Sequence, residues 1–187
     1  VAFSLIETAI AVPPSPTFRG QGEYRMEYLR IARYLQADRI FLDVETSASA
    51  EMTVRELAYR IRWIPEIRDF DKYICDVCEK DNLQSSGVGF GVAFTYARSD
   101  GVDDVFVAIA RLRHGVDFAA FDREPVRLVF LMGVPREEVH MQLILLATLA
   151  RAMSREYLRK ALLAASSPSD VIHLFKSQEP VHRGSPA

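Results

Sequence analysis

The stretch GVGFGVAFTYARSD, residues 87–100, contains the residue types and spacing best suited to chemistry. Its three glycines, each separated by one residue, allow a backbone to turn tightly or to approach a ligand closely, as phosphate-binding loops do. Tyr96 and Arg98 follow in what reads as a strand, where a phenol and a guanidinium could face a bound anion. Taken alone, the pattern predicts either an anion site or a tight turn beside a strand.

Cysteines and histidines supply the other candidate chemistry. Cys75 and Cys78 form a C-x-x-C, a spacing found in redox pairs and in half of a zinc site. The chain has no second cysteine pair, so ordinary helix packing is favoured over a metal site or a redox pair, and we expect no metal and no cofactor. His114, in RLRHGVD, is predicted to be an exposed histidine of a turn, whereas His140 remains a candidate for the site.

Length and composition predict one folded domain without a general affinity for polyanions. The chain has 187 residues, 49% of them hydrophobic, which is enough to bury a sizeable core. The 23 basic and 25 acidic side chains give a formal charge of −2, so neither nucleic acid nor an anionic membrane is an expected partner. Two cysteines and no obvious secretory signal predict a reducing, cytoplasmic setting.

The amino-terminal residues read as a separate segment. VAFSLIETAIAV is an apolar run of about a dozen residues, shorter than the roughly 20 that a membrane helix needs. Proline, serine and glycine in residues 13–22 are typical of a linker. We therefore expect a segment and linker at 1–22, the domain at 23–176 and a flexible tail at 177–187. Because the chain begins with valine, we also expect a possible attachment to a larger chain upstream.

Short apolar runs predict the centre of a sheet. Residues 105–109 (VFVAI) and 128–132 (LVFLM) are continuously apolar and bounded by turn residues, as strands covered on both faces are. Residues 39–44 (RIFLDV) place apolar residues at alternate positions, which predicts a half-buried first strand. The first two runs are therefore expected to be interior strands of one sheet.

Helical periodicity predicts the remaining elements. Two helices, from Glu51 and from about Phe70, precede the glycine stretch, and further helices begin at Ser154 and at the capping sequence Ser-Pro-Ser-Asp of 167–170. Strands and helices alternate along the chain. This order predicts an α/β three-layer sandwich, a mixed central sheet with helices on both faces.

Residues 136–153 predict a long helix with an unusually wide apolar surface. Its inward positions are predicted to be Val139, Leu143, Leu146, Ala147 and Ala150. Further apolar residues at 141, 144 and 145 widen that surface beyond one stripe. The helix is therefore expected to be heavily buried.

Several blocks of the sequence resemble the type-2 enzyme IIA domains of the bacterial phosphotransferase system, the fructose, mannitol and nitrogen-regulatory group. GVGFGVAFTYARSD is similar to the family's active-site loop, which leads to a Pro-His-Ala-Arg stretch whose histidine carries phosphate. Residues 115–135 (GVDFAAFDREPVRLVFLMGVP) and 140–153 (HMQLILLATLARAM) resemble the family's strand-turn-strand segment and long helix, and LQADRIFLDV resembles the segment that opens such domains. The resemblance covers about residues 26–175 and implies the enzyme IIA type-2 fold.

At the phosphate site the sequence departs from this family. Tyr96 stands where the family has its phosphorylated histidine, Thr95 where it has proline, and Phe90 where it usually has asparagine. Lys80 lies where the family usually has arginine. The resemblance implies that the surround of the phosphate site is partly kept: Ser86, Arg98 and His140 match family positions, and Gly87 and Gly89 belong to the glycine loop.

Tyrosine is a poor chemical replacement for that histidine. An imidazole with a pKa of about 6.5 presents a neutral, nucleophilic nitrogen at pH 7, whereas a phenol with a pKa of about 10 stays protonated. A phosphohistidine contains a high-energy P–N bond that can pass its phosphate on, whereas a tyrosine phosphate is a stable ester. We therefore expect no phosphate relay through Tyr96, unless Lys80 or Arg98 activates the phenol.

Three functions follow as hypotheses from the resemblance and these departures. The first is a regulatory domain derived from enzyme IIA that binds a protein partner: a phosphotransferase component, or a transporter or regulator that it controls. The second is a phosphocarrier that uses His140 or Tyr96. The third is a sensor of phosphate or another small anion, in which loop amides act with Lys80 and Arg98. All three imply a cytoplasmic protein, alone or as the soluble domain of a larger one.

Overall fold

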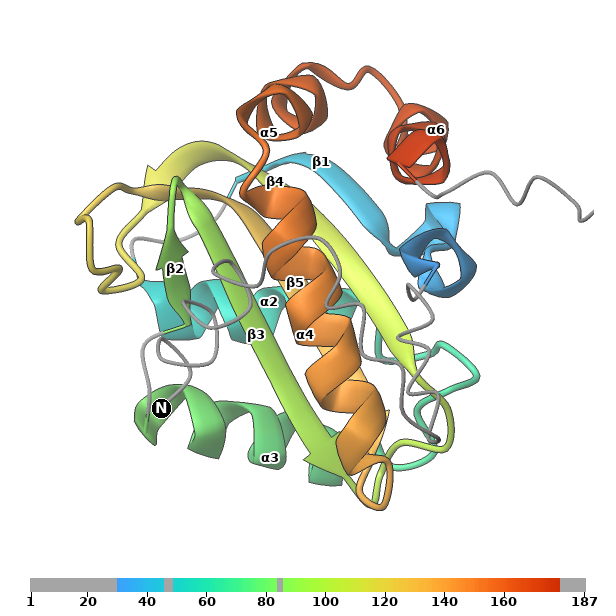
Figure 1. Cartoon of the computed structure of the whole chain (residues 1–187). Helices are drawn as coiled ribbons and strands as arrows, with labels where there is room; N and C mark the ends of the chain where they lie inside the picture. The colour runs from blue at the N-terminus through green and yellow to red at the C-terminus, as the bar shows by residue number, and fades with distance from the viewer. Residues whose placement is uncertain (1–29, 46–48, 84–85, 179–187) are drawn as a thin grey trace, which may run out of the picture.

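The computed structural model of the protein describes residues 30–45, 49–83 and 86–178 (Figure 1). The predicted segment and linker at 1–22 lie outside the described residues, as do residues 23–29 of the predicted domain. The predicted domain end at 176 falls inside the last helix, α6 (Pro168–Gln178), and the rest of the predicted tail lies outside the description.

A mixed five-stranded sheet forms the centre of the described structure (Figure 1). Its order is β1-β4-β5-β3-β2; β1 runs parallel to β4 and β3 parallel to β5, whereas β4–β5 and β2–β3 are antiparallel. The strands are β1 (Ile40–Val44), β2 (Gly87–Gly89), β3 (Val92–Ser99), β4 (Phe106–Val116) and β5 (Val126–Pro135). The two strands predicted to be interior are confirmed as β4 and β5, because each has a neighbouring strand on both sides.

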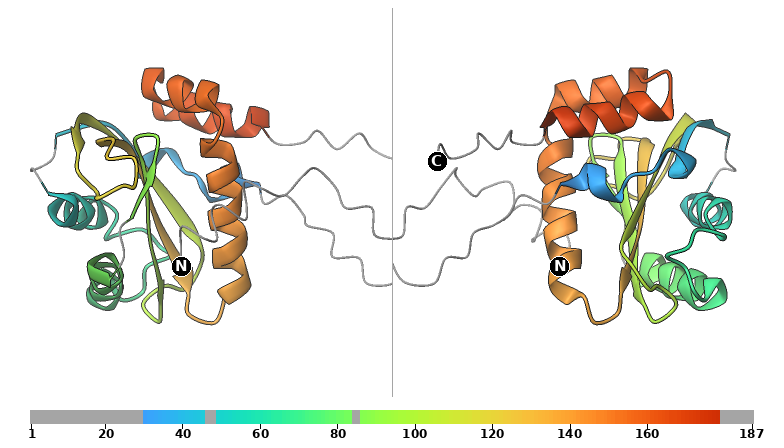
Figure 2. Two further views of the ribbon diagram at one scale, coloured as in Figure 1. Left: turned by 60° about the vertical axis from the view of Figure 1, so that its left-hand side comes forward. Right: turned by 90° about the vertical axis from the view of Figure 1, so that its right-hand side faces the viewer.

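Helices cover both faces of this sheet, which confirms the predicted three-layer sandwich (Figure 2). One face carries α2 (Ala50–Arg60) and α3 (Phe70–Leu83). The other carries α4 (Val139–Met153), α5 (Glu156–Ala164) and α6, together with the short helix η1 (Ile31–Tyr34). A second short helix, η2 (Ala37–Arg39), leads into β1.

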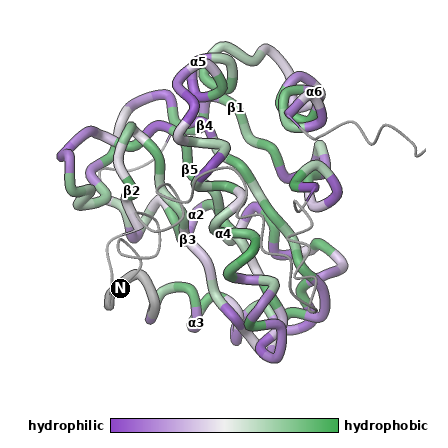
Figure 3. Tube along the Cα trace, viewed as in Figure 1, coloured by the Kyte–Doolittle hydropathy of each residue, from purple (hydrophilic) through white to green (hydrophobic). Residues whose placement is uncertain are grey.

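Two apolar clusters hold the three layers together. Four apolar residues on α2 and directly after it are at most 2% exposed and pack with α3 and with one face of the strands: Val54, Leu57, Ala58 and Ile61. Alternate residues of β3 point to the two faces, so Ala93 and Ala97 join this cluster while Val92 and Phe94 join the cluster under α4. Figure 3 shows how strongly hydrophobic the central strands are, as expected for strands covered on both sides.

Two sequence predictions about this fold are wrong. His114 lies within β4 rather than in a turn, because β4 continues past it to the pairing of Val116 with Val126; the histidine is exposed, as expected. The helix α4 is not heavily buried all round, because Val139 and Leu143, both predicted to face inward, are 43% and 44% exposed.

Candidate functional site

The glycine stretch forms the hairpin between β2 and β3. Gly89 pairs with Val92, so Phe90 and Gly91 are the two turn residues, and both have positive φ, 57° and 68°. Positive φ at both central residues is the signature of a type I′ turn, which favours Asn-Gly. A Cβ at Gly87 would lie 2.8 Å from the Cβ of Ala120, so this glycine is required by packing. Turn geometry and packing therefore account for these glycines.

The backbone amide at the tip of this hairpin is already engaged. The Phe90 N–H donates to Oδ2 of Asp122 at 2.6 Å, which ties the turn to the loop between β4 and β5. On the other side the guanidinium of Arg159, from α5, lies 4.6 Å from the centre of the Phe90 ring. The hairpin tip is thus held between two other elements.

Tyr96 lies in the second half of β3, opposite Met132 of β5. Its side chain is half-buried and packs on the apolar cluster beneath α4. Met141 of α4 packs on the same cluster. Since residues alternate along a strand, Tyr96 points to the face that carries α4 and Thr95 points to the face that carries α3.

The first turn of α4 is positioned against the carboxyl end of β3. Nη1 of Arg98 donates to the carbonyl oxygen of Arg136 at 3.5 Å, and the Tyr34 hydroxyl donates to Sδ of Met141 at 3.9 Å. Figure 1 shows the tip of β3 and the start of α4 at the same end of the sheet. His140 is exposed in this first turn. Tyr96, Arg98 and His140, three residues predicted for the site, are therefore brought to one end of the sheet.

Three of the other predicted site residues lie along the hairpin, each farther from Tyr96 than the one before, and the fourth lies in α3. The carbonyl of Ser86 accepts a hydrogen bond from the Phe94 N–H, so Ser86 lies beside the strand two residues before Tyr96. Gly87 pairs with Ala93, and Gly89 lies at the turn, farther still from the phenol. Lys80 belongs to the last turn of α3, and its side chain lies outside the described part of the structure.

A charged network that the sequence did not reveal holds the connection from β5 to α4. Nε of Arg136 pairs with Oδ2 of Asp100 at 2.6 Å, and its Nη2 lies 3.7 Å from Oδ2 of Asp76 in α3. Nζ of Lys72 pairs with Oδ1 of Asp76 at 2.5 Å. Three segments distant in sequence are thereby joined at the connection that leads into α4, and no motif in the sequence predicts this.

Asp76 is the most buried member of this network, with 11% of its side chain exposed. Burial alone would raise its pKa, but hydrogen bonds from Lys72 and Ser99 and the charges of Lys72 and Arg136 outweigh burial and hold the pKa below its ordinary value. The carboxylate is therefore charged at neutral pH and anchors Arg136, whose carbonyl receives Arg98.

Thr95 is fully buried, and its hydroxyl has no hydrogen-bond partner among the described residues. It stands at the position where the resemblance places a proline, and it faces α3 rather than Tyr96. An unsatisfied buried hydroxyl costs about 1–3 kcal/mol. The residue before Tyr96 is thus a source of instability rather than a further member of the site.

Cys75 and Cys78 lie one turn apart in α3, Cys75 exposed and Cys78 buried, with no disulfide between them. Within the described ranges no group of three or more histidine, cysteine, aspartate or glutamate side chains is arranged to hold a metal. The expectation that this pair is reduced and metal-free stays a prediction.

The chain matches the family model for the EIIA 2 component of the phosphoenolpyruvate-dependent sugar phosphotransferase system over residues 33–178. The chain belongs to this family. The match confirms the resemblance seen in the sequence and extends through α6. None of the helices described for this EIIA chain is long and apolar enough to cross a membrane.

Relatives of this EIIA chain include components of the fructose-specific PTS system and nitrogen regulatory proteins. It is 34% identical over 105 residues to the PTS system fructose-specific EIIA component of Haloferax volcanii, covering 56% of this chain and 68% of that protein. It is 30% identical over 138 residues to the nitrogen regulatory protein of Pseudomonas aeruginosa, covering 71% and 88%. Against the fructose-specific EIIABC component of Bacillus subtilis, identity is 26%, and the match spans 81% of this chain but only 24% of the longer protein.

Solved EIIA structures share the fold. The nitrogen regulatory protein IIA-Ntr of Neisseria meningitidis superposes with a TM-score of 0.70 at 28% identity, over 78% of this chain and 98% of that one. The enzyme IIA-Mtl from a complex with phosphorylated enzyme IIB-Mtl of Escherichia coli gives a TM-score of 0.66 at 22% identity, over 77% and 98%. The predicted enzyme IIA type-2 fold is confirmed.

Proposed function

We propose that this EIIA domain no longer accepts phosphate on β3 and acts as a regulatory domain that binds a protein partner. The observation that supports this most is Tyr96 itself, on β3 at the position where the resemblance places the phosphohistidine. Its phenol packs on the apolar cluster beneath α4, and a phenol is a weaker phosphate acceptor than an imidazole. The resemblance matches Arg98 and His140 to positions around the family's phosphate site, which supports a partly kept surround.

Two kinds of partner follow from the relatives. The Pseudomonas aeruginosa relative is named a nitrogen regulatory protein, and the Escherichia coli IIA-Mtl neighbour was solved in a complex with phosphorylated IIB-Mtl. For this chain we propose a phosphotransferase component, or a transporter or regulator, as the bound protein. Such a role implies a cytoplasmic location.

A phosphate-transfer assay tests this proposal. The purified chain is incubated with the general phosphotransferase enzymes and radiolabelled phosphoenolpyruvate, beside an active enzyme IIA as positive control. The wild-type chain is expected to stay unlabelled. A label that appears on the chain and then moves to an enzyme IIB would contradict the regulatory role.

The Tyr96→His variant is the informative companion, with Tyr96→Phe as its matched control. Histidine restores a nucleophilic nitrogen at the carboxyl end of β3 while Thr95 and Phe90 stay as they are. Labelling of Tyr96→His but not of Tyr96→Phe would show that the phosphate site survives and that only the acceptor was lost. We expect this gain, because Arg98 still contacts Arg136 in the connection that leads into α4.

A phosphocarrier is the second candidate, supported by the exposed imidazole of His140 in the first turn of α4. Here the P–O bond of phosphoenolpyruvate breaks, the enolate of pyruvate leaves, and the phosphoryl group passes through the general phosphotransferase enzymes to form a P–N bond on His140. The chemistry of the label separates the two acceptors, because phosphohistidine is lost in acid whereas phosphotyrosine survives it. An acid-labile label that disappears in His140→Ala would establish this alternative.

A further inference from the structure

Trp63, the chain's single tryptophan, is 83% exposed although two nearby isoleucines are buried. Ile61 and Ile64 are 1% and 8% exposed. Glu66 is held by two hydrogen bonds from Nη2 of Arg39, at 2.9 and 2.7 Å. The indole therefore projects from a well-anchored segment between α2 and α3, and large aromatic side chains presented in this way are typical anchors of protein interfaces.

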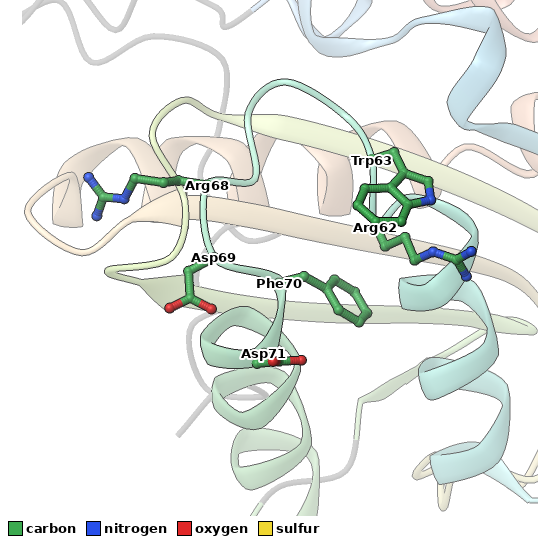
Figure 4. A pocket seen from close by; sticks show the side chains of 6 residues that line it. All are labelled: Arg62, Trp63, Arg68, Asp69, Phe70 and Asp71. Atoms are coloured by element: carbon green, nitrogen blue, oxygen red, sulfur yellow. The ribbon is translucent and has the colours of Figure 1, made fainter.

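Trp63 borders two open hollows. The larger, of about 530 Å³, is lined by Arg62, Trp63, Arg68, Asp69, Phe70 and Asp71. The smaller, of about 440 Å³, shares Arg62 and Trp63 and continues along α2. Figure 4 shows the Phe70 ring extending from the start of α3 toward the side of Arg62 and Trp63, while Arg68 points away. This face, which we call the Trp63 face, thus carries both a projecting ring and space to receive one.

The Trp63 face also carries charges of both signs that have no ion-pair partner among the described residues. The guanidinium of Arg62 lies over the Trp63 ring, 5.1 Å from its centre. Among the residues that the structure describes, neither Arg62 nor the exposed Asp71 has an ion-pair partner. Asp69 accepts a hydrogen bond from the N–H of Lys72 but likewise has no ion-pair partner within the described ranges, whereas Arg60 pairs with Glu56 and Arg68 with Asp103.

We propose that the Trp63 face binds a second copy of this chain about a twofold axis. A twofold interface uses the same patch on both copies, so the patch must complement itself. The Trp63 face meets this requirement, because Trp63 of each copy can enter the hollow of the other while Arg62 pairs with Asp71 across the axis, twice. A partner of a single charge sign would leave one of these two groups unpaired.

This dimer would leave the candidate phosphate site open. The Trp63 face lies on the side of α2 and α3, whereas Tyr96 and His140 lie on the side of α4, across the sheet (Figure 2). The two copies would therefore each present an independent site to a protein partner. Because the dimer does not depend on the chemistry of Tyr96, it can be tested separately from the proposed function.

The single tryptophan makes self-association directly measurable. Intrinsic fluorescence and sedimentation velocity are recorded on the full chain over a roughly thousandfold concentration range. We expect the emission to shift to shorter wavelength and to become protected from iodide quenching as the mass rises from monomer to dimer. The proposal would be overturned if the protein stays monomeric over the whole concentration range. It would also be overturned if the mass rises while iodide quenches the indole as strongly as in the dilute protein.

Variants locate the interface. Trp63→Ala is expected to stay monomeric by sedimentation, whereas Phe121→Ala, which removes another aromatic ring of 82% exposure, should dimerise like the wild type. Arg62→Asp and Asp71→Arg should each weaken association by about tenfold or more, and their combination should recover it, because the ion pair is re-formed with its signs exchanged. Association that persists in Trp63→Ala, or no recovery in a folded double variant, would contradict the twofold geometry.

Discussion

Replacement of Glu66 by glutamine tests the buried ion pair that anchors the segment of Trp63. The side chain of Arg39 is 1% exposed and that of Glu66 is 15% exposed. The nearest other carboxylate, that of Asp38, is 65% exposed and lies 3.7 Å from Nε of Arg39, so it compensates the charge only weakly. Glutamine keeps the shape of Glu66 and one acceptor oxygen but leaves the guanidinium charge buried without its counterion.

The expected loss in free energy of unfolding is about 3 kcal/mol, the lower end of the range for breaking a buried pair, because one hydrogen bond can persist. For a domain of this size that loss lowers the melting temperature by about 6–12 °C. Urea unfolding followed by circular dichroism measures it. The double variant Arg39→Met/Glu66→Met removes both charges and is expected to be more stable than Glu66→Gln.

Glu51→Gln is the matched control, because it breaks an exposed ion pair within α2, between Glu51 and Arg55. Oε1 of Glu51 lies 3.0 Å from Nε of Arg55, and both side chains are about half exposed. Its cost should stay below about 0.5 kcal/mol. A loss of less than about 1 kcal/mol for Glu66→Gln, or a loss equal to that of the control, would refute the view that the Arg39 charge depends on Glu66.

Three further predictions follow from single residues. Thr95→Val should raise the free energy of unfolding by about 1 kcal/mol in urea titration, because it removes a buried hydroxyl without a described partner; a decrease would show that the hydroxyl is satisfied. Phe90→Asn should be more stable than Phe90→Ala by about 0.5–1 kcal/mol, since both lose the Arg159 contact and only asparagine favours positive φ; equal stabilities would argue against the type I′ turn. Asp76→Asn should cost about 2 kcal/mol at pH 7. Because folding lowers the pKa of Asp76, the charged carboxylate stabilises the fold above the ordinary carboxyl pKa of about 4, and this stabilisation is lost as pH falls through the lower pKa of the folded state. The difference in unfolding free energy between Asp76→Asn and the wild type should therefore narrow in acid. A difference independent of pH would contradict this.

Local patterns in the sequence were sufficient to predict the helices and strands and the ends of some helices. The Ser-Pro-Ser-Asp sequence predicted the start of α6, where the Asp170 N–H donates to Oγ of Ser167 and the Ser167 N–H donates to Oδ2 of Asp170. Continuous apolar runs identified β4 and β5 as interior strands. These features were predictable because they depend on residues that are close in sequence.

The buried face of α4 and the charged network of Arg136 and Asp76 were decided only by the tertiary structure. Apolar residues surround most of α4, so its periodicity could not choose between the observed buried face, with Leu145 and Leu149, and the predicted one with Val139. Asp76 and Arg136 lie sixty residues apart in sequence, and folding alone brings their charges together. Long-range packing selects one of several faces that the local pattern allows, and it determines which charges meet.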